Sequence, residues 1–140
     1  MSSLLLVMVI IFCTSNGDTT TVFNEKEGKG GVSGMLTFTS SEASDVVHFD
    51  INVLGCQFSA TEVPYSSVKD EAEPYIKFLY PDFRWTNMEE QVLNCSMTVT
   101  QLADFNEWLY ASYPDADQVV EIRSVKNIWY GEFTKSQNVQ

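Results

Sequence analysis

Residues 32–54 read VSGMLTFTSSEASDVVHFDINVL, and apolar side chains alternate with polar ones in both halves of this stretch. A period of two residues is typical of a β-strand with one buried face. The apolar positions that would face the core are Val32, Leu36 and Phe38 in the first half, and Val47, Phe49, Ile51 and Val53 in the second. Polar residues 40–44 separate the halves and predict a turn, so we expect a β-hairpin.

Two further regions predict strands. Residues 91–99 alternate, and the side chains expected on the inward face are Leu93, Cys95, Met97 and Val99. Residues 118–125 and 128–133 predict either one long strand or a tight hairpin that turns at Lys126-Asn127. These segments would extend the sheet that the first hairpin begins.

Two regions predict helices. Leu102, Phe105, Leu109 and Tyr113 recur at spacings of three and four, which indicates a helix over residues 101–113 with Thr100 as its N-cap. One solution for residues 74–80 is a short helix, because proline is tolerated in a first helical turn. The order of elements predicts an α+β fold, with a mainly antiparallel sheet and one or two helices packed on a face. An all-β sandwich is the alternative if the middle segment is a loop.

Composition limits the class of protein. The chain has 140 residues, of which 44% are hydrophobic and 13% aromatic, and its formal net charge is −11. This length and apolar content suit one globular domain rather than a disordered chain. Nucleic acids and anionic lipid headgroups are bound through basic residues of the protein, so the negative net charge argues against both as partners. One histidine and three cysteines exclude the usual Cys/His zinc cage, and we expect no metal or cofactor.

The first seventeen residues are expected to be a signal peptide. Residues 1–12 read MSSLLLVMVIIF, an uncharged run that is too short to cross a bilayer as a helix. Ser15 and Gly17 occupy the −3 and −1 positions of a small-residue cleavage site. We therefore expect a secreted, extracellular protein with no membrane anchor after cleavage. Its parts would be a flexible leader (18–31), a single domain (32–134) and a flexible tail (135–140).

Cleavage after residue 17 would remove Cys13 and leave Cys56 and Cys95. In an oxidising compartment these two cysteines would form a disulfide, and two buried free thiols are the alternative. Asn94-Cys95-Ser96 is also an N-glycosylation sequon. In the strand expected there, Asn94 would point outward where Cys95 points inward, which favours Asn94 as a glycan acceptor.

Residues 78–85 read FLYPDFRW and are the stretch most typical of a binding surface. Aromatic and arginine side chains dominate interface hot spots because they bury a large area with few rotatable bonds. We expect four residues to bind a partner: Tyr80, Phe83, Arg84 and Trp85. The alternative is that these aromatic side chains close the core and the arginine pairs with a carboxylate.

These observations favour a non-enzymatic binding protein that engages an extracellular protein through an acidic surface containing aromatic residues. The negative field would steer a basic partner. One alternative is a carrier that holds a small apolar ligand between sheet and helix, because aromatic residues are abundant. Another is a carboxylate-dependent hydrolase, for which His48 and Asp50 share one strand face. That pair lacks a nucleophile at readable spacing, so no catalytic residue is assigned.

Overall fold

The computed structural model describes residues 17–26, 30–69, 75–79, 87–95, 100–111 and 118–136. These residues form one nine-stranded sheet in which every ladder is antiparallel. They also contain one α-helix and one 3-10 turn. The predicted class, a mainly antiparallel sheet with a helix beside it, is confirmed. Within this part of the chain a second sheet, as a sandwich would need, is not formed.

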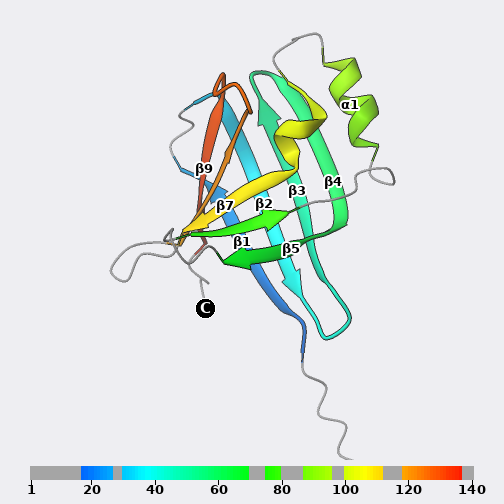
Figure 1. Cartoon of the computed structure of the whole chain (residues 1–140), viewed down its shortest axis with the longest axis vertical. Coiled ribbons are helices and arrows are strands. Elements are labelled where there is room, and N and C mark those ends of the chain that lie inside the picture. Colours follow the sequence, from blue (N-terminus) through cyan, green and yellow to red (C-terminus); the bar gives the residue numbers. More distant parts are fainter. Residues whose placement is uncertain are drawn as a thin grey trace, which may run out of the picture.

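The strands follow one another across the sheet in the order β4-β3-β2-β1-β9-β8-β7-β6-β5. Their bounds are β1 (Thr19–Glu25), β2 (Val32–Ser40), β3 (Asp45–Val53), β4 (Cys56–Pro64), β5 (Ser66–Lys69), β6 (Tyr75–Leu79), β7 (Glu107–Ala111), β8 (Val119–Arg123) and β9 (Tyr130–Lys135). The helical elements are α1 (Met88–Asn94) and the 3-10 turn η1 (Leu102–Phe105). Both lie at the same end of the sheet (Figure 1).

The β2–β3 hairpin has the register that the alternation of residues 32–54 predicts. Leu36 pairs with Phe49, and Phe38 pairs with Val47. All four side chains are buried, so the inward face of the hairpin is continuous and apolar. The hairpin prediction is therefore confirmed, including the residues that face the core.

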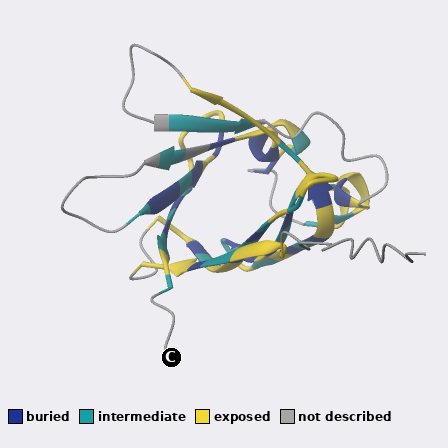
Figure 2. Ribbon diagram, turned by 90° about the horizontal axis from the view of Figure 1, so that it is seen from below, coloured by how far each residue is buried: buried dark blue, intermediate teal, exposed yellow. Residues whose placement is uncertain are grey.

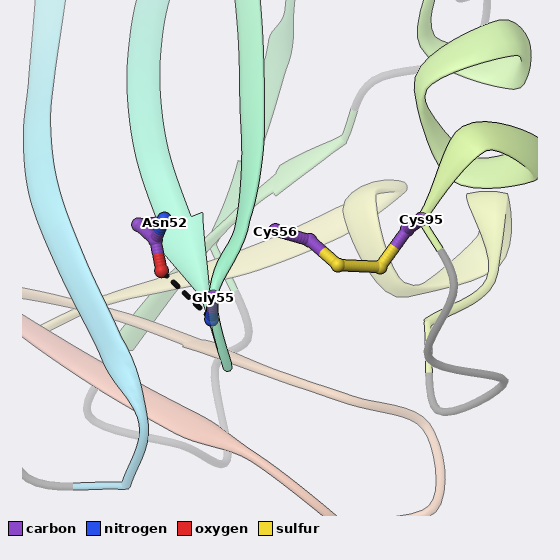
Figure 3. The surroundings of a disulfide bond; sticks show 4 residues. All are labelled: Asn52, Gly55, Cys56 and Cys95. Carbon is purple, nitrogen blue, oxygen red and sulfur yellow. Dashed lines mark hydrogen bonds between the residues drawn. A yellow bond between two sulfur atoms is a disulfide. The ribbon is translucent and has the colours of Figure 1, made fainter.

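A tight turn joins β3 to β4. Leu54 and Gly55 both have positive φ, of 51° and 93°, as the two-residue turns favoured in β-hairpins require. The Asn52 Oδ1 atom accepts a hydrogen bond from the Gly55 backbone N–H at 2.9 Å (Figure 3). This turn places Cys56, the first residue of β4, at the end of the sheet near α1.

The sheet is curled, and its two outermost strands, β4 and β5, follow each other directly in the chain. β4 ends at Pro64, β5 begins at Ser66, and Tyr65 alone lies between them. No ladder joins β4 to β5 among the described residues, so covalent continuity links these strands. Figure 2 shows the strands surrounding a common interior. Inward-facing side chains from both halves of the sheet therefore meet in one core.

Aromatic side chains fill the interior at the end that carries α1 and η1. The Phe105 ring of η1 is fully buried and lies 5.0 Å from the Phe58 ring and 6.0 Å from the Trp129 ring, centroid to centroid. Phe49 of β3 meets Trp108 of β7 edge-on at 5.2 Å. Such pairs contribute about 0.5–1.5 kcal/mol each beyond the area that they bury. The turn η1 therefore closes this end of the core.

Helix α1 packs against β4 through an apolar stripe. Met88, Val92 and Cys95 follow one another at spacings of four and three, which places them on one helical face. Met88 is fully buried, and Val92 and Cys95 are partly buried against the core. Glu89 and Glu90 stand in the first turn, where negative charge interacts favourably with the helix dipole.

Gln91 of α1 binds the free edge of β4. Its Oε1 atom accepts a hydrogen bond from the Ser59 backbone N–H at 2.7 Å, and its Nε2 atom donates to the Ser59 carbonyl at 2.8 Å. The side-chain amide thus makes both hydrogen bonds that a neighbouring strand would make at Ser59. Exposed edge strands invite pairing with other chains, so Gln91 blocks one such position.

The flexible leader expected for residues 18–31 is wrong for Thr19–Glu25, which form β1. Phe23 is buried and pairs with Leu36 of β2, while Glu25 pairs with Phe133 of β9. β1 therefore joins the two halves of the sheet. At the other end of the chain, β9 reaches Lys135, the first residue of the expected tail.

Three secondary-structure predictions are wrong and one is confirmed. The strand expected at residues 91–99 is helical up to Asn94, and residues 96–99 lie outside the described residues. The helix expected at 101–113 is a single 3-10 turn followed by β7, and the short helix expected at 74–80 is replaced by β6. β6 and β7 pair with each other, so ladder formation and core packing outweigh the local helical spacing. The alternative of a hairpin at 118–133 is confirmed by the β8–β9 ladder.

We expect Gln91→Ala to lower the free energy of unfolding by about 1–3 kcal/mol, because two hydrogen bonds to Ser59 are lost. Urea unfolding followed by tryptophan fluorescence would measure the change. Glu90→Ala, an exposed neighbour on the same helix, is the matched control and should stay within about 0.5 kcal/mol of the wild type. Equal losses in the two variants would contradict a stabilising role for the contact with Ser59.

Candidate functional site

Five aromatic side chains meet in the interior at the end away from α1 and η1. We call them the inner aromatic cluster: Phe23 of β1, Phe38 of β2, Tyr65 between β4 and β5, Phe78 of β6 and Tyr110 of β7. Residues that pair with cluster members across the sheet also face the interior. Phe78, for example, pairs with the buried Trp108. Because its members come from both halves of the sheet, the cluster exists only when the sheet is curled.

Phe38 lies at the centre of the inner aromatic cluster. Its ring centroid is 4.8 Å from that of Phe78, 5.4 Å from that of Tyr65 and 5.6 Å from that of Phe23. Tyr110 completes the set, at 6.1 Å from Phe23 and 5.8 Å from Phe78. Most of these contacts are edge-to-face, the arrangement that the quadrupole of an aromatic ring favours.

The inner aromatic cluster is only partly buried. Phe23 and Phe38 are 3% and 6% exposed, whereas Tyr65, Phe78 and Tyr110 keep intermediate exposure. Both helical elements of the described chain lie at the opposite end (Figure 1). Apolar ring surface is therefore accessible at this end, and two tyrosines add polar atoms to it. Such a lining suits a small, flat apolar ligand.

The Tyr65 hydroxyl stays neutral over a wide pH range. Burial raises the pKa of Tyr65 to about 12, and the nearby negative charge of Asp45 adds to the shift. The backbone also links these two residues, because the Tyr65 N–H donates to the Asp45 carbonyl at 3.2 Å. At neutral pH the cluster therefore presents an uncharged phenol beside a carboxylate.

A hollow of about 470 Å³ lies beside η1 and is lined mainly by polar residues, among them Asp104, Glu107, Glu121 and Arg123. Asp104 is 2% exposed, but both of its carboxylate oxygens are engaged by the backbone. Oδ2 accepts a hydrogen bond from the Gln101 N–H at 2.8 Å, and Oδ1 accepts one from the Val125 N–H at 2.6 Å. Asp104 therefore ties η1 to the β8–β9 loop, which is a structural role.

His48 and Asp50, the pair named for hydrolysis, lie on the outer face of β3. The Asp50 Oδ1 atom accepts a hydrogen bond from Gln57 Nε2 on β4, and His48 pairs with Thr37 on β2. Within the described ranges, no three His, Cys, Asp or Glu side chains are placed to hold a metal ion. Hydroxyl residues lie opposite both members of the pair, Thr37 opposite His48 and Ser59 opposite Asp50, so the hydrolase alternative stays a prediction.

The residues predicted to bind a partner, namely Tyr80, Phe83, Arg84 and Trp85, lie outside the described residues. Their binding role stays a prediction. Phe78, at the start of the same sequence stretch, is described and belongs to the inner aromatic cluster. This part of the stretch therefore faces the interior.

The predicted disulfide is present (Figure 3). It joins Cys56, the first residue of β4, to Cys95, the C-cap of α1, and the two Cα atoms are 5.7 Å apart. Asn94 precedes this bond as the last residue of α1 and is exposed, in a helix rather than in the strand that was expected. Glycosylation of Asn94 stays a prediction.

Comparisons with protein-family models, with curated proteins and with solved structures find no match. Where the chain is described, no helix is both long and apolar enough to cross a membrane.

The sequence patterns identify only part of the inner aromatic cluster. Phe38 is predicted to face inward, but Phe23 falls in the expected leader, and Phe78 and Tyr110 fall in expected helices. A strand signal was available for two of these residues. Ile76 and Phe78 stand two apart, as do Trp108 and Tyr110, which is the spacing of side chains on one strand face.

We expect the Tyr65 hydroxyl of the folded protein to ionise near pH 12, and this component should disappear from the titration of Tyr65→Phe. The pKa of Tyr130 is also raised, by burial and by its hydrogen bond to Glu132, so a late component remains in the variant. The phenol of Tyr65 is the neutral form, so its raised pKa stabilises the folded protein below the unfolded value of about 10, and this stability is lost as pH rises towards 12. Ultraviolet absorbance of tyrosinate would follow the ionisation. In urea, all tyrosines should titrate near 10; a Tyr65→Phe curve identical to the wild type would contradict the assignment.

Proposed function

We propose that this protein is a secreted, non-enzymatic binding protein that holds a small, flat apolar ligand against the inner aromatic cluster. One observation carries the proposal: aromatic rings from both halves of the sheet converge, and three of the five are partly exposed. Ligand sites are lined mostly by apolar and aromatic side chains with a few polar groups, and the mouths of curled sheets are common places for them. Binding of this kind needs neither a cofactor nor a catalytic group.

The negative charge of the protein restricts which ligands would bind at the inner aromatic cluster. The chain carries a formal net charge of −11, and Asp45 is close enough to raise the pKa of Tyr65. A carboxylate or sulfonate on the ligand would be repelled, while a neutral ring system would pack against Phe78 and Tyr110 without that penalty. The preferred ligand is therefore neutral or cationic and aromatic or otherwise flat.

The neutral fluorescent probe N-phenyl-1-naphthylamine tests this binding site. We expect a saturable rise in its fluorescence with the wild-type protein, and an affinity about three- to tenfold lower for Phe78→Ala, because one aromatic contact is lost. Val68→Ala, an exposed position on neighbouring β5, is the control and should bind as the wild type does. The anionic probe anilinonaphthalene sulfonate should bind more weakly than the neutral one.

Two results would count against the ligand site. The first is a fluorescence rise that never saturates, since this indicates non-specific adsorption. The second is equal affinity of Phe78→Ala and Val68→Ala, since the probe would then lie elsewhere. Circular dichroism of Phe78→Ala, compared with the wild type, would separate loss of the site from loss of the fold.

Surface charge favours a second candidate, the binding of a basic extracellular protein. Besides the net charge of −11, nine acidic side chains of the described residues are exposed: Asp18, Glu25, Glu42, Asp45, Asp50, Glu62, Glu89, Glu90 and Glu107. Long-range attraction between this surface and a basic protein would speed association and would be screened by salt. The sequence stretch that contains Phe83 and Trp85 would supply the apolar contacts.

Capture from extracellular fluid tests the second candidate. We expect the oxidised mature protein to retain a basic protein, less of it as salt is added, and little of it with the double variant Phe83→Ala, Trp85→Ala. Mass spectrometry would identify what is retained. Retention that responds neither to salt nor to the double variant would rule out this mode of binding.

A further inference from the structure

Asn94 is the acceptor in the single Asn-x-Ser/Thr sequon of the 140 residues, and the middle residue of that sequon is a disulfide cysteine. We propose that Asn94 is glycosylated only while Cys95 is still a thiol, and that formation of the Cys56–Cys95 bond ends its use as an acceptor. The inference is independent of the ligand proposed for the inner aromatic cluster.

The folded backbone around Asn94 is held at several points. The Cys95 N–H donates to the Gln91 carbonyl at 3.1 Å, which closes the last turn of α1. The Gln91 side chain is in turn bound to Ser59 of β4 through two hydrogen bonds. The disulfide fixes Cys95 to the start of the same strand. Asn94 therefore sits in a segment that cannot change its conformation without breaking these contacts.

Glycan transfer requires such a change. The sequon must bend within the transferase so that the hydroxyl of its third residue approaches the acceptor amide, and such a bend displaces Asn94 and Cys95 from the positions that the end of α1 and the disulfide give them. Asn94 Nδ2 then bonds to the anomeric carbon of a lipid-diphosphate-linked oligosaccharide. The carbon–oxygen bond to the diphosphate breaks, and one amide proton passes to a base of the transferase.

Disulfide formation competes for the same residues. The thiols of Cys56 and Cys95 lose two protons and two electrons to the disulfide of an oxidoreductase, which becomes a dithiol. Once this bond has formed, α1 and β4 are joined next to the acceptor. The order of the two reactions then decides how many molecules carry a glycan.

The folded protein can accommodate a glycan that was added earlier. Asn94 is exposed and borders a hollow of about 320 Å³ that is also lined by Gln57, Gln91 and the two disulfide cysteines. The side-chain carbonyl of Gln57 is a suitable acceptor for a sugar hydroxyl, whereas the Gln91 amide is already bound to Ser59. A glycan here would cover the disulfide and lie at the opposite end of the sheet from the inner aromatic cluster (Figure 1).

Expression of the full chain in cells with a eukaryotic secretory pathway tests the proposal. Glycan occupancy is read as a mobility shift that disappears when an amidase removes Asn-linked glycans. We expect a mixture of two forms for the wild type and a higher glycosylated fraction for Cys56→Ser, in which the sequon is unchanged. A pulse of dithiothreitol during synthesis of the wild type should raise the fraction in the same way. Asn94→Gln should give one unshifted form.

Each other outcome overturns the proposal. No shift in the wild type, Cys56→Ser and the dithiothreitol pulse would show that Asn94 is not an acceptor. A shift of equal extent in all three would show that the disulfide does not limit transfer. Gln91→Ala, which loosens α1 but keeps both cysteines, separates folding from the disulfide: a rise in its glycosylated fraction equal to that of Cys56→Ser would also overturn the proposal. Probe binding by unglycosylated protein remains a separate measurement, so this proposal and the ligand site can fail independently.

Discussion

The interior of this protein depends on the short link between β4 and β5, the outermost strands of the sheet. Because Tyr65 alone separates them, the sheet must curl until its two ends lie together. Tyr65 also contacts Phe38 and Phe78, so the residue that closes the sheet is part of the inner aromatic cluster. A ligand that binds the cluster would therefore stabilise the curled form, by an amount that grows with its concentration relative to its dissociation constant.

Because no ladder joins β4 to β5 in the described part of the chain, backbone N–H and C=O groups on these two edges lack a partner strand. Helix α1 supplies hydrogen-bond partners for some of these groups on β4. Gln91 takes the place of a neighbouring strand at Ser59, and the Cys56–Cys95 bond keeps the helix close to that edge. The two contacts support each other, because the disulfide limits how far the glutamine can move. This arrangement explains why a helix of seven residues, too short to be stable alone, is retained on the surface.

The sequence predicts those parts of the fold in which local pattern and tertiary packing agree. Residues 32–54 alternate strictly, and the hairpin forms with the expected faces. Residues 101–111 show the opposite case: Leu102 and Phe105 have helical spacing, but Trp108 and Tyr110 are drawn into a ladder with β6 that the local pattern does not contain. The disulfide follows from counting cysteines, whereas most of the inner aromatic cluster depends on long-range strand pairing and could not be located without it.

The two ends of the interior are stabilised to different degrees, and this difference bears on function. At one end Phe105, Asp104 and the disulfide bring η1, the β8–β9 loop and α1 together through packing, hydrogen bonds and a covalent bond. At the other end, the described residues contribute ring contacts around Phe38 without a helix above them. Binding sites are drawn from the less stable parts of a structure because a ligand must enter and leave. A glycan at Asn94 would add to the rigid end and leave the aromatic end free, so modification and ligand binding would not compete for the same surface.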